Sequence, residues 1–205
     1  MYNTSKCYTT RVALMTGNYY QHSDREWTHT ATLGEVLRPV GYSTAWIGKH
    51  HGDFNPFTRG FDTFSGFLGG AISFWNPGGI TKTGKAIPGI VYDWAFNEKI
   101  INPYIQEYPW HATDAFTDWS IDWLDQPVNS QKPWSLYLAY NAPHWPLHAH
   151  QKDIDKFKGV YDSGYKTIRE SRYKRQVQMG LFDPNVCKLS PAEYATELAW
   201  NKLSA

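Results

Sequence analysis

The pattern of polar and hydrophobic positions at the start of the chain predicts a short helix. Polar residues lead up to Cys7, a hydrophobic run follows at 12–15, and Gly17 comes two residues later. Residues that can cap a helix precede Cys7, and glycine is a common helix end, so we expect a helix that begins at Cys7 and stops at Gly17.

The later patterns indicate that helices and strands alternate. Apolar residues at helical spacing cover 32–41, where Pro39 must shorten or bend the last turn, and a short β-rich segment follows at 42–48. Helical periodicity returns at 112–124. The strongest strand pattern, at 132–140, is apolar on both faces and is therefore expected to be central in a sheet. This order predicts an α/β fold.

Two stretches interrupt the alternation. Residues 53–92 are rich in Gly, Pro, Asn and Phe, so we expect turns and an irregular insert, and such long inserts are more often functional than not. Residues 153–179 have a helical pattern that breaks near Gly159 and Gly164, and the basic residues within it are expected on a solvated face.

Composition narrows the classes of function. The 205 residues, 41% of them hydrophobic, suffice for a domain with a sizeable core, and the formal charge of +1 gives no electrostatic reason to expect nucleic acid or a membrane surface. No apolar run approaches the ~18 residues of a membrane helix. Aromatic residues make up 17%, with ten Trp, which favours a large core and loop packing over the alternative of a cleft with sugar-stacking walls. Two cysteines, Cys7 and Cys187, do not make a disulfide framework.

Cys7 is the first candidate for chemistry. The unpaired N–H groups and the positive dipole end of a helix start favour an anion, and Arg11, one turn further on, faces the same side as Cys7. This setting suits a nucleophile or a modified residue. A small cysteine that simply begins an ordinary helix is the alternative.

Three further side chains follow predicted strands. Lys49 and His51 share a face if the strand at 42–48 runs on through them, and a cation and an imidazole beside a helix start can bind an oxyanion and move its proton. Solvated surface residues are the alternative. His144 lies between two prolines after the strand at 132–140, which holds it in place. His144, His148 and His150 also have spacings that suggest zinc, but no fourth ligand accompanies them.

Three stretches resemble the signatures of the formylglycine-dependent sulfatases, an arylsulfatase family of the alkaline phosphatase-like superfamily. Cys7-Tyr-Thr-Thr-Arg11, followed by Thr-Gly17, is similar to Cys-x-Pro-x-Arg and Thr-Gly, with threonine in the place of proline. Gly-Lys49-His-His51 is similar to the second signature, with His50 in the place of tryptophan. Ala-Pro-His144-Trp-Pro is similar to the third.

The resemblance implies roles for these residues. It implies that a formylglycine-generating enzyme oxidises Cys7 to formylglycine (3-oxoalanine), whose hydrated aldehyde is the nucleophile of the family. The implied catalytic residues are Cys7, Arg11, Lys49, His51 and His144. In the family the arginine and lysine hold charge, the first histidine contacts the formylglycine hydroxyls, and the second touches the sulfate or protonates the leaving alcohol. The resemblance also implies Ca²⁺ or Mg²⁺, to which this chain would contribute Cys7 as formylglycine.

The resemblance further implies an alkaline phosphatase-like α/β/α sandwich, of which residues 1–205 form the central part of the catalytic domain. Residues 53–92 are then the insert on the active-site side, and 153–205 a helical extension. No Asp-Asp dipeptide or later Asp-Asn occurs, so we expect the remaining metal ligands to lie outside this chain and the chain alone to be inactive. Arg59 and Asp62, in a stretch similar to the family's Arg-Gly-Phe-Asp, are expected to form a buried pair.

The expected partner is a sulfated small molecule or glycan, in a periplasmic or secreted enzyme, and we expect no signal peptide in this chain. Two alternatives stay open. One is a phosphodiester or phosphonate hydrolase of the same superfamily, and the other is a non-catalytic relative that binds sulfated glycans.

Overall fold

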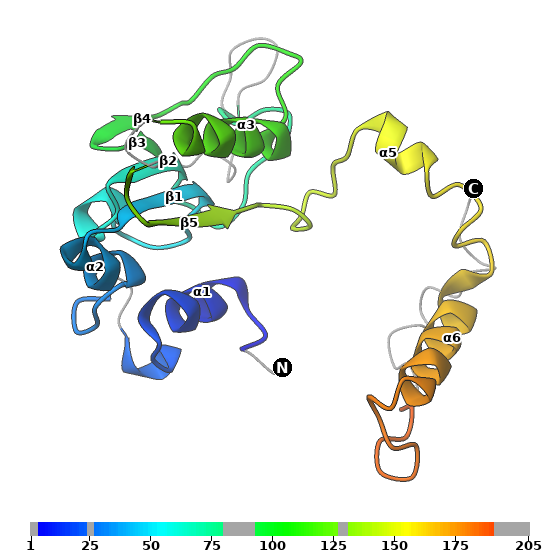
Figure 1. Ribbon diagram of the computed structural model, residues 1–205. Helices are drawn as coiled ribbons and strands as arrows, with labels where there is room; N and C mark the ends of the chain where they lie inside the picture. Colours follow the sequence, from blue (N-terminus) through cyan, green and yellow to red (C-terminus); the bar gives the residue numbers. More distant parts are fainter. Residues whose placement is uncertain (1–3, 24–26, 80–92, 127–130, 191–205) are drawn as a thin grey trace. The chain divides into compact units, whose positions relative to one another are not determined.

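The computed structural model describes residues 4–23, 27–79, 93–126 and 131–190 and divides the chain into two units, Met1–His148 and Ala149–Ala205 (Figure 1). The α-helices are α1 (Cys7–Thr16), α2 (Leu33–Leu37), α3 (Ala112–Leu124), α5 (Gln151–Asp155) and α6 (Gly164–Gln178). The strands are β1 (Ser43–Lys49), β2 (Thr63–Phe67), β3 (Trp94–Phe96), β4 (Lys99–Ile101) and β5 (Trp134–Ala139). Short 3-10 helices cover Tyr20–His22, Arg38–Val40 and Pro56–Arg59.

The five strands form one sheet in the order β4-β3-β2-β1-β5. Strand β1 lies between β2 and β5 and is parallel to both, whereas β3 and β4 are added antiparallel. Gly48 of β1 lies opposite Gly66 on one side and Ala139 on the other. Because parallel strands end at the same edge of a sheet, the segments that follow Lys49 and Ala139 both leave from the carboxyl edge, where α/β folds place their chemistry.

Two predictions about the sheet are wrong. Residues 53–92 are not irregular throughout, because β2 lies within them and pairs on both sides. Residues 80–92 lie outside the described residues. The strand β5 is not central: in the described part of the chain it pairs with β1 alone, and its Trp134 is 48% exposed. An apolar pattern on both faces of a strand does not require a neighbouring strand on both edges.

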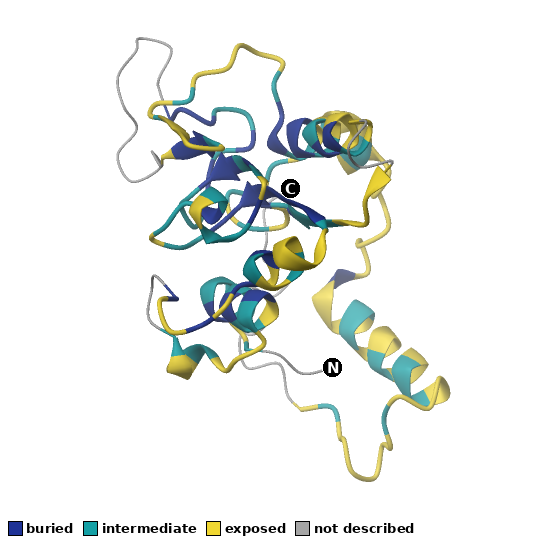
Figure 2. Ribbon diagram, turned by 60° about the vertical axis from the view of Figure 1, so that its left-hand side comes forward, coloured by how far each residue is buried: buried dark blue, intermediate teal, exposed yellow. Residues whose placement is uncertain are grey.

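Each face of the sheet carries its own hydrophobic core. On one face, Ala45 and Ile47 of β1 pack with Phe116 and Trp123 of α3, whose predicted bounds and apolar face are confirmed. On the other face, Trp46 packs with Val12 and Met15 of α1. Strand β1 is buried along its whole length, and most residues of β2 and β3 are buried as well, whereas β4 is mainly exposed (Figure 2). The large share of aromatic residues is therefore explained mainly by packing.

Local sequence signals account for the caps and turns of the segment from α2 to β1. Thr32 and Glu35 form a reciprocal capping box at the start of α2, and Gly41 ends the 3-10 turn that contains Pro39. The predicted apolar stripe is not buried, however, because Val36 is 56% and Val40 69% exposed. Gly34 is the buried residue of this helix.

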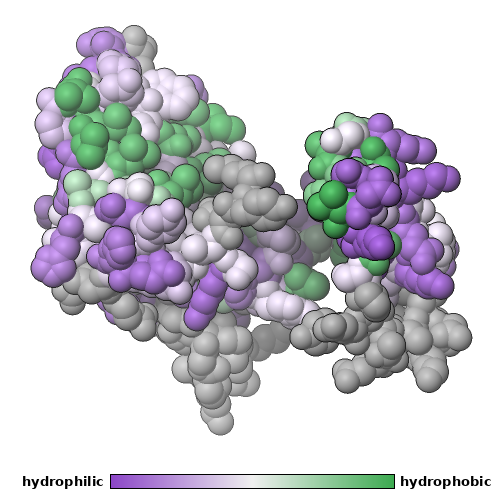
Figure 3. Space-filling model, turned by 90° about the horizontal axis from the view of Figure 1, so that it is seen from below, coloured by the Kyte–Doolittle hydropathy of each residue, from purple (hydrophilic) through white to green (hydrophobic). Residues whose placement is uncertain are grey.

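The unit that contains α5 and α6 has little core of its own. Among its described residues, 149–190, only Gly164 is buried. Apolar side chains reach the surface beside charged ones, as the mixture of green and purple in Figure 3 shows. The predicted helix break between Gly159 and Gly164 is confirmed, and so is the exposure of the basic residues except Arg169, which is half-buried. No helix among the described residues has the length and apolar character needed to cross a membrane.

Candidate anion site at the start of helix α1

Helix α1 presents Cys7 at its first position. Lys6 is the N-cap without a side-chain cap, and the first hydrogen bond of the helix runs from the N–H of Thr10 to the carbonyl of Lys6 at 3.0 Å. The N–H groups of residues 7–9 therefore have no acceptor within the helix, and they make the region around the half-buried Cys7 attractive to anions. Gly17 ends the helix with φ of 70°, as its sequence predicts.

Two cations lie beside this helix start. Arg11 comes from α1 itself, and its Nη1 donates to the carbonyl of Lys49 at 2.8 Å. The Lys49 side chain is buried, with 2% of the residue exposed, at the end of β1. Burial, followed by the charge of Arg11, lowers the pKa of Lys49 to about 8, while Cys7 acts in the opposite direction. Burial also lowers the pKa of Arg11, while Tyr137 and Cys7 raise it.

His51 reaches the same helix by a turn rather than by continuing the strand. Its φ is 67°, and its main-chain N–H donates to the carbonyl of Leu68 at 3.0 Å. Its ring meets the ring of Tyr8 edge-on at a centroid distance of 5.9 Å. A Cβ at Gly70 would lie 2.8 Å from its Nε2, so glycine at that position leaves room for the imidazole. Lys49, His51 and the first turn of α1 thus come together at the carboxyl edge of the sheet.

His50, between these two residues, points into the core. Its ring is fully buried and lies against Trp46 at 4.8 Å, Phe54 at 4.4 Å and Trp27 at 5.7 Å between centroids. Burial, followed by the charges of Arg11 and His51, lowers the pKa of His50 to about 3, so the imidazole is neutral at pH 7. The position filled by tryptophan in the sulfatase pattern is therefore filled here by a neutral aromatic ring.

His144 lies in the loop that follows β5, and its described hydrogen bonds stay within that loop. Its N–H donates to the carbonyl of Asn141 at 2.9 Å, and its Nδ1 lies 2.8 Å from the carbonyl oxygen of Trp145. The loop leaves the same sheet edge as Lys49, but no contact brings His144 to Cys7 among the described residues. His148 packs edge-on against Phe74, and the zinc alternative stays a prediction.

The predicted Arg59–Asp62 pair is wrong. Nε of Arg59 lies 2.6 Å from a carboxylate oxygen of Glu35, and its Nη2 donates to the carbonyls of Trp27 and Thr30. Asp62 instead pairs with Arg38 at 3.0 Å. The reason is tertiary, because α2 brings its capping-box carboxylate to the 3-10 turn that carries Arg59.

Two residues that the sequence analysis did not single out support the cations. The Tyr137 hydroxyl accepts from Nη1 of Arg11 at 3.2 Å, and Nε1 of Trp46 donates to the carbonyl of Lys49 at 3.1 Å. The signal for Tyr137 was the two-residue period of β5. Leu136 and Leu138 pack on the α3 face, so Tyr137 had to lie on the opposite face, where a buried phenol needs a polar partner.

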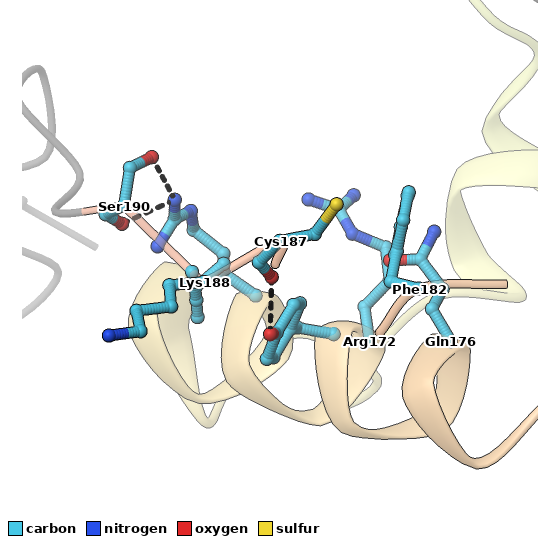
Figure 4. Close-up of a pocket in the computed structure, with 9 residues that line it drawn as sticks. Arg172, Gln176, Phe182, Cys187, Lys188 and Ser190 are labelled. Atoms are coloured by element: carbon cyan, nitrogen blue, oxygen red, sulfur yellow. Dashed lines mark hydrogen bonds between the residues drawn. The ribbon is translucent and has the colours of Figure 1, made fainter. Parts of the chain in front are cut away.

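A second group of cations lines an open hollow of about 270 Å³ between α6 and the segment that follows it (Figure 4). Arg169 donates to the carbonyl and hydroxyl of Ser190, and Tyr173 donates to the carbonyl of Cys187. These bonds tie residues 187–190 to the helix. Arg172 and Lys188 also line the hollow, and both are exposed.

The fold and site together define an α/β protein with a half-buried cysteine at a helix start and two cations beside it. The sulfatase family model matches residues 1–195, and the chain belongs to the sulfatase family. The structure is part of an alkaline phosphatase-like fold, as its likeness to solved sulfatases shows.

Three relatives illustrate the match. An uncharacterized sulfatase of Schizosaccharomyces pombe is 30% identical over 181 residues, which cover 85% of this chain and 32% of the relative. The arylsulfatase of Klebsiella aerogenes is 29% identical over 154 residues, which cover 73% of this chain and 32% of that enzyme. The crystal structure of Ps i-CgsB in complex with k-i-k-neocarrahexaose is 29% identical, with a TM-score of 0.56, covering 74% of this chain and 38% of that one. The chain spans about a third of the length of the curated relatives it matches.

The family implies a formylglycine and a divalent metal ion, and the described residues fit these two groups differently. Cys7 fits a formylglycine precursor, because it is half-buried at a helix start beside Arg11 and Lys49. A hard divalent ion needs about six or more oxygen ligands, mainly from carboxylates. The charged groups that act on Arg11 and Lys49 among the described residues are each other, Cys7 and Tyr137, without a carboxylate. The described residues alone do not fit Ca²⁺ or Mg²⁺.

Proposed function

We propose that the protein hydrolyses sulfate esters through a formylglycine formed from Cys7. The observation that carries this proposal is the positive charge beside Cys7, where Arg11 and the buried Lys49 lie at the N-terminal end of helix α1. Buried cations without carboxylate partners favour an anionic ligand, and a sulfate group supplies the charge and the acceptor oxygens.

The residues have distinct proposed roles. When formed, formylglycine supplies a hydrated aldehyde as the nucleophile of the family. Arg11 and Lys49 bind the sulfate oxygens and stabilise the charge that develops on them. His51, which packs against the neighbour of Cys7, moves a proton at the nucleophile, and His144 protonates the leaving alcohol from the loop after β5. No step is assigned to a metal ion.

The proposed substrate is a sulfated glycan or a smaller sulfate ester. The complex of Ps i-CgsB with k-i-k-neocarrahexaose, a structure 29% identical to this chain, supports the glycan. We also propose that a formylglycine-generating enzyme acts on Cys7 and that the full protein is periplasmic or secreted, as the family resemblance implies. Fractionation of cells that make the full-length protein tests the location.

The first test is the mass of the Cys7 peptide after co-expression with a formylglycine-generating enzyme. We expect a species lighter by about 18 Da, the difference between a thiol and an aldehyde side chain. Cys7→Ala is the control without a modifiable residue. A peptide that keeps the mass of cysteine under conditions that convert a known sulfatase would contradict the proposal and favour a non-catalytic glycan-binding protein.

The second test is catalysis in a chimera in which this chain replaces the matching third of the Klebsiella aerogenes arylsulfatase. We expect hydrolysis of an aryl sulfate, and a loss of ~10²–10³ in rate for Lys49→Ala as for other oxyanion partners. Paired assays with aryl sulfate and aryl phosphodiester separate the two hydrolase classes. Preference for the phosphodiester would favour the alternative.

A further inference from the structure

We infer that Tyr137 is a positioning residue, whose hydroxyl holds the guanidinium of Arg11 against the main chain of Lys49 so that both cations stay beside Cys7. The inference rests on the proposed function for the identity of the anion, but the arrangement itself is a property of the described chain.

A single nitrogen of Arg11 joins two strands. Nη1 donates to the Lys49 carbonyl at the end of β1, at 2.8 Å, and to the Tyr137 hydroxyl on β5, at 3.2 Å. The guanidinium carbon also lies 5.9 Å from the centre of the Tyr137 ring. Tyr137 therefore contacts Arg11 through both its hydroxyl and its ring, which restricts the rotation of a long side chain.

Trp46 of the neighbouring strand β1 supports Tyr137 in turn. Trp46 lies directly opposite Tyr137 in the parallel pairing of β1 with β5, and the two rings meet edge-on at 4.8 Å. Nε1 of the same Trp46 donates to the Lys49 carbonyl at 3.1 Å. The carbonyl thus receives donors from Arg11 and Trp46, and the contacts form a closed ring from Tyr137 to Arg11, Lys49 and Trp46.

This ring holds the guanidinium of Arg11 at the end of β1, from which the buried Lys49 side chain also comes. Without these contacts the guanidinium would turn toward water, because the desolvation of a charge is unfavourable. A charge-assisted bond to a phenol, in a partly buried place, is stronger than a bond between neutral groups. Donors fixed before an anion arrives stabilise it without the cost of reorganisation.

The test uses the 205-residue chain with unmodified Cys7 and two variants, each of which removes one tyrosine hydroxyl. Tyr137→Phe keeps the ring contacts and removes the bond to Arg11. Tyr140→Phe is the matched control, because the hydroxyl of Tyr140 bonds to that of Thr117 at 2.7 Å, and Tyr140 packs with the core on the α3 face. Both variants lose one buried hydroxyl contact, so a merely structural role would affect them alike.

NMR of the arginine side chains is the first measurement. We expect the guanidinium protons of Arg11 to exchange about 10-fold faster in Tyr137→Phe, the effect of losing one bond to a charged group, and to be unchanged in Tyr140→Phe. Binding of inorganic sulfate, followed in the same spectra, should weaken roughly 3- to 10-fold only in Tyr137→Phe. Unchanged exchange and unchanged sulfate affinity in Tyr137→Phe would overturn the inference.

A titration keeps the inference testable if Tyr137→Phe does not fold. Burial raises the pKa of Tyr137, and the charge of Arg11 lowers it. Arg11→Gln should therefore raise the pKa of Tyr137, measured with ring-labelled tyrosine. The absence of any shift would overturn the inference. Neither readout depends on conversion of Cys7, so failure of the proposed function and failure of this inference are distinguishable.

Discussion

The guanidinium of Arg11 donates to the main-chain carbonyl of Lys49 at 2.8 Å, across 38 residues of sequence. This bond ties helix α1 to the end of strand β1. Two of the residues implied to bind sulfate therefore do not move independently, and a change at one should be measurable at the other.

The first prediction concerns the pH range in which inorganic sulfate binds. Burial, and then the charge of Arg11, lowers the pKa of Lys49 to about 8. Only the protonated amine attracts an anion, so sulfate affinity should fall as the pH rises through about 8. Calorimetric titrations from pH 6 to 10 measure this.

Two variants sharpen that experiment. Lys49→Arg should keep sulfate affinity at high pH, because a guanidinium stays charged throughout the range. Arg11→Met should raise the pKa of Lys49, since the charge of Arg11 lowers it. Sulfate binding with the same pH profile in the parent and in Lys49→Arg would show that Lys49 is not a ligand of the anion.

The second prediction concerns Thr9, which stands where the sulfatase signature has proline. Its hydroxyl donates to the Lys6 carbonyl at 2.9 Å, and its N–H lies in the first turn, where it has no acceptor within the helix. Proline is tolerated at such a position, so Thr9→Pro should keep α1 and raise the conversion of Cys7 to formylglycine. Peptide mass spectrometry after co-expression measures the yield, and Thr10→Ala is the control. Equal yields for parent and Thr9→Pro would show that proline is not needed.

The elements predicted well are those with strong local signals. Gly17 and the run before it specify the end of α1, and the periodicity of 112–124 gives the bounds of α3. The strands β3 and β4 have three residues each, which is too short for a two-residue pattern to emerge. β2 was missed because Gly66, which lies opposite Gly48, gives that stretch the composition of a turn.

The site was predictable in its residue types more than in its contacts. The spacing around Cys7 and Arg11 pointed to an anion, because both lie on one helix. The partners of Arg59 and Asp62 were not predictable, since an ion pair depends on which element folds over it. The role of Tyr137 depends on the pairing of β1 with β5, which sequence periodicity does not specify.

The third prediction concerns His50 and acid stability. Its pKa is about 3 in the folded protein, against 6.5 for an ordinary histidine, so the unfolded chain binds more protons between these values. Stability should therefore fall as the pH drops from about 6.5 toward 3, by about 1 kcal/mol between pH 6.5 and 5.5. Urea denaturation at both pH values measures this.

His50→Phe should remove that dependence, because the replacement has no proton to bind and keeps the ring contacts with Trp46 and Phe54. The same substitution at the exposed His22 is the control and should leave the dependence intact. An equal loss of stability between pH 6.5 and 5.5 in the parent and in His50→Phe would show that His50 does not cause the pH dependence.

The fourth prediction compares two glycines that both have a positive φ. Gly41 has φ of 91° with nothing within 4 Å of an added Cβ, whereas Gly48 has φ of 108° and its Cβ would overlap the Ala139 carbonyl. Gly41→Ala should cost about 1 kcal/mol from backbone strain alone. Gly48→Ala should cost on the order of 2–4 kcal/mol, because it also forces β1 and β5 apart. Chemical denaturation measures both losses of stability. Equal losses would mean that β5 moves away from the added methyl group at no measurable cost in stability.

The last prediction concerns calcium and the chain as given. The groups that act electrostatically on Arg11 and Lys49, among the described residues, are each other, Cys7 and Tyr137. Two cations repel a divalent ion, and Cys7 as formylglycine would supply one ligand where about six or more are needed. Water would have to fill the other positions, so Ca²⁺ should bind more weakly than about 1 mM, the weak end of protein sites. Aryl sulfate hydrolysis by this chain should accordingly be unmeasurable even with Cys7 converted. Calorimetry with the converted chain tests the affinity, and the Klebsiella chimera, in which we expect tight binding and turnover, is the positive control. Micromolar Ca²⁺ affinity together with turnover by the 205-residue chain would mean that its own carboxylates complete the site.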